Sequence, residues 1–394
     1  MKICAITTWP PHRDGISLYS AYLYTYISKH AKVKVLANII DTTIPSDTKL
    51  PGLSGRCDIV RCWRRDSILY PSAIFSNALK ERADINHLQH GWLLYGGKTA
   101  PLLFPILLFF LRLTGRPLIT TMHTVIAGKP RLHKSRIVSF LSRTIIVFLT
   151  KLIVKISDKV IVHNLLMKKA LEDLYLLKKY SQKIHVIPHG VMETVNVGGG
   201  KRGGEVKILS LGFVRKGKGV EYLLEAFKAY SFKYPNAILI IAGGRHAHDR
   251  EDYISLMRRK VSGDMLKNVI FTDFVDEEKL DKLILESHII VLLSRGEYFI
   301  EASGTLARVA MYGKPVICSR VPKFKADLED GKDCIMVESD NPKSLAEALL
   351  LLTNNRSLRE EIGRNLKMKF KDRVWGKVAE QHIHLFKAAL EKKH

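Results

Sequence analysis

Two glutamates, Glu297 and Glu301, lie in the stretch SRGEYFIEASGTLARVAMYGKPVICSR, directly after the strand-like run IIVLLS. We expect residues 295–303 to form a loop and a helix to begin near Gly304, with Ser303 as its cap. The free N–H groups and the dipole of such a helix favour an anion. A carboxylate beside a bound diphosphate would be repelled, so either glutamate makes chemical sense only if it accepts hydrogen bonds from sugar hydroxyls. The alternative is that each is a solvated loop acid.

A second stretch, LSLGFVRKGKGVEYLLEAFKAY, carries three cations, Arg215, Lys216 and Lys218, between a predicted strand and a helix that starts near Gly219. The carboxyl edge of a parallel sheet is where ligands bind in open α/β folds, and the helix start adds its positive dipole end. The combination suits a diphosphate. The alternative is a basic surface turn, which would have a similar sequence. The spacing does not match the phosphate loop of nucleotide triphosphatases.

Three histidines follow apolar, strand-like runs. His123 ends TTMH, His163 follows VIV, and His189 lies in VIPHGV. A histidine at the carboxyl end of a strand would face an interdomain cleft, where it hydrogen-bonds substrate or moves a proton. For His123 this function and a structural one both stay open, and His163 could simply start the next helix. For His189 we favour a structural role.

Short β-rich runs alternate with amphipathic stretches along the whole chain, which predicts parallel sheets flanked by helices. The number of strands fits two doubly wound α/β domains better than one sheet. The glycine-rich stretch ETVNVGGGKRGGEVK, where charge density also changes, marks the boundary. We therefore expect a first domain over residues 1–192, a linker over 193–206 and a second domain over 207–370.

The formal net charge of +25 is concentrated in the first half of the chain. Through Glu193 there are 28 Lys and Arg against 11 Asp and Glu, and between Asp84 and Asp158 there is no acid but ten basic residues. Nucleic acid, anionic lipid and a phosphorylated substrate are the candidate partners, and a solvated charge excess is the alternative. No nucleic-acid recognition motif with interleaved aromatics accompanies the charge.

Two apolar segments invite a membrane interpretation. The first, TAPLLFPILLFFL, has thirteen residues, too few to span a bilayer, and we expect Pro105 to interrupt any helix there. The second, KSRIVSFLSRTIIVFLTKLIVKISDK, carries Lys151, Lys155 and Lys159 at four-residue spacing, which would align them on one helical face. Such a helix either lies on anionic headgroups or is a core helix with a solvated edge. Both alternatives stay open, and a transmembrane segment is not expected.

The five cysteines, Cys4, Cys57, Cys62, Cys318 and Cys334, are scattered and show no metal-ligand spacing. They predict no disulfide framework, so a reducing, cytoplasmic compartment is expected. The N-terminal MKICAITTWPP resembles a first strand and turn, not a signal peptide.

Taken in order, these stretches resemble the retaining nucleotide-sugar glycosyltransferases of family 4, over essentially the whole chain. PPHRDGISLYS is similar to the family's first glycine loop, LGFVRKGKGVEYLLEAF to its donor-diphosphate loop, and VIFTDFVDEEKLDKLILESHIIVLLS with EASGTLARVAMYGKPVI to its donor site. RVWGKVAEQHIHLF resembles the terminal helix. The resemblance implies a GT-B fold, with two Rossmann-like domains facing a deep cleft and residues 371–394 packing back on the first domain.

The resemblance also implies the chemistry. A sugar would move from a nucleotide diphosphate sugar with retention at the anomeric carbon and without a required metal or other cofactor. By position His123 matches the histidine near the donor sugar, and Glu301, with Glu297 in reserve, would bind that sugar. The residues matched to the donor diphosphate are Gly15, Arg215, Lys218, Ser303, Gly304 and Thr305.

The chain departs from the family pattern where two glutamates normally lie eight positions apart. Anchoring on AMYGKPV puts Ile300 at the first position and Arg308 at the second, and the sequence resembles the branch with an ASGxL donor loop. The second glutamate usually binds the ribose in the family, so that role stays unassigned here.

We therefore expect a cytoplasmic retaining hexosyltransferase, peripheral to the cytoplasmic membrane face, whose basic first half binds a glycan or lipid-linked acceptor. No nucleic acid is expected as a partner. The alternatives are a nucleotide-sugar epimerase or phosphorylase, or a non-catalytic nucleotide-sugar sensor, on the same fold.

Overall fold

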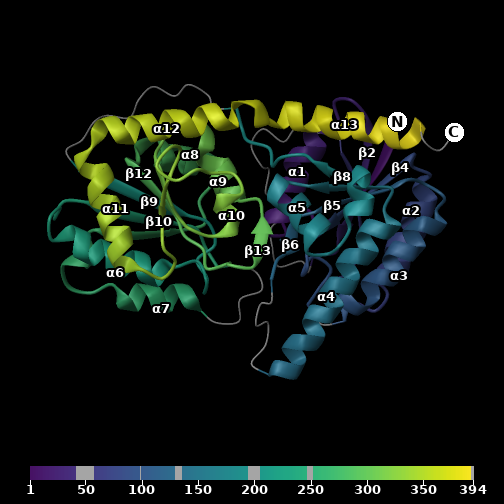
Figure 1. The fold of residues 1–394 in the computed structure, drawn as a ribbon, viewed down its shortest axis with the longest axis horizontal. Coiled ribbons are helices and arrows are strands. Elements are labelled where there is room, and N and C mark those ends of the chain that lie inside the picture. Colours follow the sequence, from purple (N-terminus) through teal and green to yellow (C-terminus); the bar gives the residue numbers. More distant parts are fainter. Residues whose placement is uncertain (41–56, 98, 129–134, 194–204, 246–251, 392–394) are drawn as a thin grey trace. The chain divides into compact units, whose positions relative to one another are not determined.

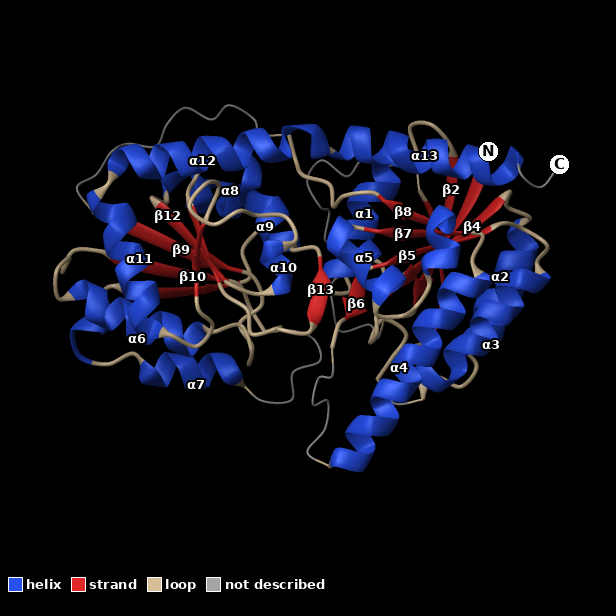
Figure 2. Ribbon diagram, in the orientation of Figure 1, coloured by secondary structure: helices blue, strands red, loops and turns tan. Residues whose placement is uncertain are grey.

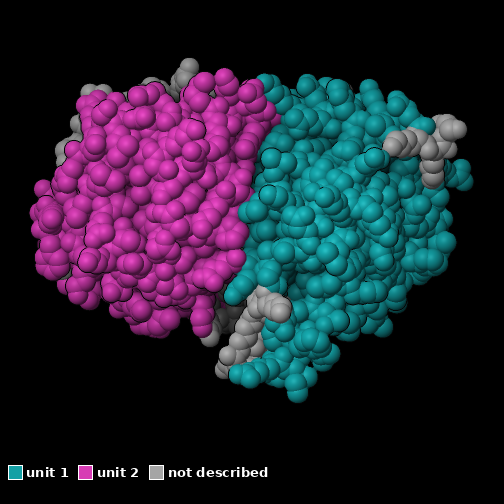
Figure 3. All heavy atoms as spheres, in the orientation of Figure 1, with its two compact units in different colours: residues 1–190, 298–302, 375–394 teal, residues 191–297, 303–374 magenta. Residues whose placement is uncertain are grey.

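The computed structural model describes residues 1–40, 57–97, 99–128, 135–193, 205–245 and 252–391. The chain divides into two compact units, each assembled from more than one segment (Figure 3). Unit 1 comprises Met1–Gly190, Tyr298–Ala302 and Trp375–His394, and unit 2 comprises Val191–Glu297 and Ser303–Val374. Most of the expected linker, 193–206, lies outside the described residues.

Unit 1 is built on a parallel sheet of seven strands in the order β3-β2-β1-β4-β5-β7-β8. Figure 2 draws the strands of both units in red. The strands are β1 (Lys2–Ile6), β2 (Lys32–Asn38), β3 (Asp58–Trp63), β4 (Ile85–His90), β5 (Leu118–Met122), β7 (Lys159–Val162) and β8 (Ile184–Val186). Strands β1, β4 and β5 are almost wholly buried, as expected of parallel strands covered on both faces.

Helices cover both faces of this sheet, and the last helix of the chain belongs to unit 1, where it packs against the first (Figure 1). They are α1 (Gly15–Ile27), α2 (Tyr70–Glu81), α3 (Ala100–Leu113), α4 (Arg136–Ile156), α5 (Leu165–Asp173) and α13 (Trp375–Glu391), with a 3₁₀ turn η1 (Lys178–Lys183). Asp14 caps α1 and Asn164 caps α5 through side-chain oxygens, which satisfies backbone donors that helix starts leave open.

Two expectations for the apolar segments were wrong. Pro105 does not interrupt a helix, because α3 continues through it; only one backbone bond is lost, and the buried Phe104, Leu107 and Leu108 hold the helix on the core. Lys159 does not share a helical face with Lys151 and Lys155, because α4 ends at Ile156 and Lys159 begins β7, where it is buried.

The expected loop over residues 295–303 contains a strand instead. β13 (Phe299–Glu301) pairs antiparallel with β6 (Thr124–Ile126) in a two-stranded sheet that belongs to unit 1. Local sequence did not reveal the strand because its hydrogen-bonding partner lies about half the chain away.

Unit 2 has a parallel sheet of six strands in the order β11-β10-β9-β12-β14-β15. The strands are β9 (Lys207–Leu211), β10 (Ile238–Ala242), β11 (Val269–Asp273), β12 (Ile289–Leu292), β14 (Val316–Ser319) and β15 (Ile335–Val337). Its helices are α6 (Val220–Ser231), α7 (Tyr253–Lys260), α8 (Glu277–Glu286), α9 (Gly304–Val309), α10 (Pro322–Lys325), α11 (Pro342–Asn354) and α12 (Arg356–Phe370). The 3₁₀ turns are η2 (Gly263–Lys267), η3 (Ala310–Tyr312) and η4 (Lys371–Arg373).

The predicted α/β class with two parallel-sheet domains is confirmed. In each unit the sheet order reverses beside the first strand: β1 lies between β2 and β4, and β9 lies between β10 and β12. Ligands of open α/β sheets bind at the carboxyl ends of the strands at such a switch point. These two edges are therefore the places in the fold where a ligand is expected.

Candidate functional site

In unit 2 the switch point lies between β9 and β12, so the loops that follow these two strands border it. The β9–α6 loop contains Arg215, Lys216 and Lys218, and the loop after β12 contains Arg295. Both loops therefore bring cations to the edge where an anionic ligand is expected.

The start of α9 packs directly on the β9–α6 loop. Gly212 has φ +115°, and a Cβ there would lie 2.9 Å from the Cγ2 of Thr305. Only glycine accommodates both this backbone conformation and this close approach. The predicted diphosphate residues Thr305, Arg215 and Lys218 therefore lie on neighbouring segments of one edge. Arg215 and Lys218 are half-buried, whereas Lys216 is exposed.

Ser303 caps α9 as predicted: its Oγ accepts a hydrogen bond from the backbone N–H of Leu306 at 3.2 Å. Ser303 itself is buried, Gly304 is exposed, and the hydroxyl of Thr305 lies 3.1 Å from that of Ser303. The helix start is thus ordered by its own side chains, with Gly304 accessible at its end.

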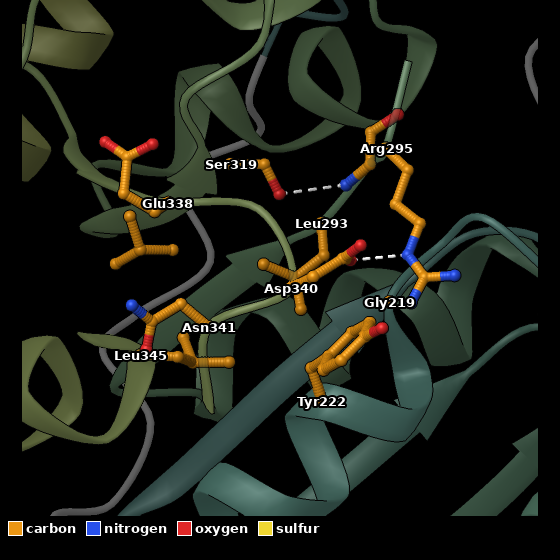
Figure 4. A pocket seen from close by; sticks show the side chains of 11 residues that line it. Gly219, Tyr222, Leu293, Arg295, Ser319, Glu338, Asp340, Asn341 and Leu345 are labelled. Carbon is orange, nitrogen blue, oxygen red and sulfur yellow. Dashed lines mark hydrogen bonds and ion pairs between the residues drawn. The ribbon is translucent and has the colours of Figure 1, made fainter. Parts of the chain in front are cut away.

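A pocket at this edge is lined mostly by residues to which the sequence analysis gave no role (Figure 4). Gly219 before α6 and Arg295 in the loop after β12 border it, together with the last residue of β14 and residues at and after the end of β15. The Arg295 guanidinium lies 4.5 Å from the ring centre of Tyr222, and it forms ion pairs with Asp340 and, at 3.2 Å, with Glu221. The signal for Arg295 was its position as the first cation after a buried strand.

Arg308, at the place of the family's second glutamate, is held by acids of α8. It forms an ion pair with Glu277 at 2.9 Å and another with Asp281, and it donates to the hydroxyl of Tyr312 at 2.8 Å. Its side chain is only 14% exposed. These partners neutralise the guanidinium within unit 2.

The two glutamates of the opening stretch belong to different units. Glu297 is exposed in unit 2. Glu301 lies in β13 of unit 1, opposite Thr124 of β6, and its Oε2 accepts a hydrogen bond from the Thr124 hydroxyl at 3.2 Å. Because Thr124 directly follows His123, the fold brings the strand end of His123 and the Glu301 carboxylate into the same part of unit 1.

Gly15 is the first residue of α1, which follows β1 at the unit 1 switch point. A Cβ on Gly15 would meet no atom within 4 Å, so the backbone there is open to close approach. The neighbouring Asp14 is occupied as the helix cap, accepting from the N–H of Ser17 at 2.6 Å. Burial alone would raise the pKa of Asp14, but hydrogen bonds from His12, Ser17 and Thr8 lower it below its usual value.

The side chain of His123 lies within a buried chain of polar groups. Its Nδ1 lies 3.1 Å from Nε2 of His163, whose Nδ1 lies 3.1 Å from the carbonyl oxygen of Ile187. The Nε2 of His123 lies 2.8 Å from Oε1 of Gln89, whose Nε2 donates to the hydroxyl of Tyr24 at 2.8 Å. Burial, reinforced by neighbouring histidines, lowers the pKa of His163 to about 3 and holds that of His123 well below its usual value.

The carbonyl contact determines the tautomer of His163. A carbonyl only accepts, so Nδ1 of His163 carries the proton that it donates to Ile187. Both ring nitrogens of His123 lie within hydrogen-bond distance of protein groups, which are Nε2 of His163 and Oε1 of Gln89. This favours a positioning role; a catalytic role stays a prediction.

His189 also makes structural contacts, since its Nδ1 lies 2.8 Å from the carbonyl oxygen of Gly190 and its ring packs against Trp375. Across the described ranges no group of three or more His, Cys, Asp or Glu side chains gathers as a metal site. All five cysteines are free thiols. The expectation that no metal is required stays a prediction.

Residues 192–369 match the model of the family described as glycosyl transferases group 1. The uncharacterized glycosyltransferase MJ1607 of Methanocaldococcus jannaschii is 29% identical over 189 residues, which is 48% of this chain and 46% of that protein. Spore coat protein SA of Bacillus subtilis is 25% identical over 186 residues, or 46% of this chain and 49% of that protein. These alignments span about half the length of the curated relatives.

Solved structures resemble the chain over nearly its whole length. Alr3699/HepE of Anabaena, solved in complex with UDP-glucose, has a TM-score of 0.71 at 13% identity and covers 98% of this chain and 100% of its own. Sucrose-phosphate synthase of Thermosynechococcus elongatus has a TM-score of 0.71 at 17% identity, with complete coverage of both chains. At such identities the likeness concerns the fold. Residues 192–369 are therefore similar to the glycosyl transferases group 1 family, and the chain shares the two-domain α/β fold of these solved glycosyltransferase structures.

Proposed function

We propose that this chain is a glycosyltransferase that moves a sugar from a nucleotide diphosphate sugar to an acceptor. The observation that carries the proposal is the edge of unit 2 between β9 and β12. There the loop that carries Arg215 and Lys218 meets the capped start of α9 at Gly212, within the region that matches the group 1 family. The complexes of Alr3699/HepE with UDP and with UDP-glucose support a uridine nucleotide sugar as the first donor to test.

The chemistry follows from the charge that develops on the departing nucleotide. Breaking the bond to the anomeric carbon leaves an additional negative charge on the diphosphate. Lys218, Arg215 and the backbone N–H groups near Gly304 would stabilise that charge more strongly in the transition state than in the ground state. Because the groups lie on ordered segments, little reorganisation would be needed when the bond breaks.

The finer features of the proposal rest on the family 4 resemblance and on the charge of unit 1. They are retention at the anomeric carbon, hexosyl transfer without a metal, an ASGxL-type donor loop, and Glu301 as the sugar-binding acid. The acid-free basic segment of unit 1 supports a lipid-linked acceptor or an anionic glycan, at the cytoplasmic membrane face.

A thermal-shift panel of UDP-, GDP- and ADP-sugars tests the donor, since a ligand that binds the folded state raises the apparent melting temperature. Product analysis with a sugar-labelled form of the stabilising donor then tests the reaction, with and without EDTA. We expect free nucleotide diphosphate and a sugar transferred to acceptor or water, in both conditions. Isomerised donor with no released nucleotide would identify an epimerase, and binding without any turnover would contradict an enzyme.

A further inference from the structure

Helix α4 presents large apolar side chains to solvent along one face. Ile137, Leu141 and Phe148 are 73%, 53% and 57% exposed. They follow the spacing that places side chains on one line of a helix, and the exposed Thr144 continues it. Surface helices of soluble proteins do not normally expose an apolar stripe of this size to water.

The neighbouring helix α3, which packs against α4, has a second such stripe. Leu102, Ile106, Phe109 and Leu113 are all exposed, at spacings of four, three and four residues, which again defines one face. Figure 1 shows the two helices beside each other in unit 1, with the first half of α4 reaching beyond the end of α3. We call these exposed side chains the α3–α4 apolar face; its members are Leu102, Ile106, Phe109, Leu113, Ile137, Phe140, Leu141 and Phe148.

Basic residues accompany this face, and neither α3 nor α4 contains an acid. Lys155 is exposed five helical turns after Ile137, on the same line of α4, and Lys151 lies one turn before it. Residues 85–157 contain no Asp or Glu. An apolar face with cations at its margin is complementary to a membrane surface, whose acyl region takes the apolar side chains and whose anionic headgroups take the cations.

The structure of α4 suits a helix that lies along a membrane surface better than one that spans the membrane. By length and composition α4 is the one helix among the described residues that could cross a membrane. However, Leu149, Ile153 and Val154 are buried in the core of unit 1, so the last two turns are committed to the fold. Residues 136–148 would extend only about 20 Å, short of a hydrocarbon core of about 30 Å.

We propose that the α3–α4 apolar face docks unit 1 on a bilayer that contains anionic phospholipid. The proposal is independent of the transferase chemistry, because docking is measured without donor or acceptor. The site would hold the enzyme against the surface on which a lipid-linked acceptor lies.

Vesicle flotation of the full chain tests the proposal, using phosphatidylcholine alone and phosphatidylcholine mixed with phosphatidylglycerol. We expect binding to the mixed vesicles that weakens as salt rises. The triple variant Ile137→Gln, Leu141→Gln, Phe148→Gln should bind at least about tenfold more weakly, because it removes three apolar side chains from the interface. Its matched control is Phe232→Gln, Leu256→Gln, Leu351→Gln, which alters three exposed apolar residues of unit 2 and should bind like the parent.

A second pair of variants separates local charge from net charge. Lys151→Glu with Lys155→Glu should weaken binding to the mixed vesicles at least about tenfold, whereas Lys228→Glu with Lys233→Glu, which makes the same charge change in unit 2, should leave it nearly unchanged. Equal losses in both pairs, no binding by the parent chain to either vesicle, or full binding by the glutamine triple variant would each overturn the proposal. The proposal would also be wrong if light scattering showed a dimer that the triple variant dissociates, while the variant still binds vesicles. The apolar face would then bind a second copy of the chain.

Discussion

The hydroxyl of Thr124 donates a hydrogen bond to Oε2 of Glu301 at 3.2 Å, across the antiparallel pair of β6 and β13. The two residues are 177 positions apart, and Glu301 is placed by a strand instead of by a loop. A carboxylate held by both a backbone pair and a side-chain donor has few conformations to lose when a ligand binds, which is the property a substrate-binding acid requires.

The substitution Glu301→Gln tests this residue. Glutamine keeps an oxygen that accepts from Thr124 but removes the charge, so the fold should be retained while kcat/KM falls by about 10² or more if the acid binds the reacting sugar. Steady-state kinetics with the donor identified by the ligand panel would measure it. Glu297→Gln, which changes the exposed glutamate of unit 2, is the matched control and should have a much smaller effect. A large loss only in the control would transfer the role to Glu297.

Lys218→Ala should lower kcat by about 10²–10³ while leaving the melting temperature nearly unchanged, because it removes one charge that stabilises the departing diphosphate. Lys216→Ala, in the same loop but exposed, should retain most of the activity. Near-parental turnover of Lys218→Ala, or an equal loss in both variants, would contradict the assignment.

The buried histidines predict that stability falls in acid. Burial lowers the pKa of His90 and of His163 to about 3, and that of His382 to about 4. Between these values and about 6.5 the unfolded chain binds protons that the folded chain does not, so the free energy of unfolding decreases as pH falls through this window. Above it the contribution is fully present. Urea unfolding at about pH 7 and about pH 5 measures the slope.

His90→Phe isolates one member of this group. Its Nδ1 is buried without a hydrogen-bond partner among the described residues, and its ring packs against Phe104 and Trp92. For each unit by which pH falls across this window, the free energy of unfolding of the variant should decrease by about 1.4 kcal/mol less than that of the parent chain. This difference is the contribution of one proton. His384→Phe changes an exposed histidine and should leave the slope as it is. Equal slopes for His90→Phe and the parent chain would show that His90 does not remain neutral.

Gly190→Ala should destabilise unit 1 by about 1–3 kcal/mol, because the added Cβ would lie 2.2 Å from the Trp375 ring and force it to move. The matched control is Gly376→Ala within α13, where a Cβ meets no atom within 4 Å and helix propensity improves. Thermal melting should show a lower transition temperature for the first variant only. A rise or no change in Gly190→Ala would mean that α13 does not pack on this glycine in solution.

Local features of the sequence were sufficient for much of the architecture. The alternation of strand-like and amphipathic runs predicted two parallel-sheet domains, and Ser303 before an apolar run predicted the start of α9, which the structure has. The cationic loop after β9 could likewise be predicted, because the strand end, the glycine turn and the helix start each depend on only a few neighbouring residues.

The tertiary structure decided what depends on distant partners. It paired Glu301 with Thr124, enclosed His123 between His163 and Gln89, and gave Arg308 its acids on α8. Hydrophobic period and capping rules describe the chain over one or two turns of a helix. They carry no information about contacts between residues far apart in the chain, and those contacts determine whether a charged or titratable side chain is exposed, neutralised or held in place.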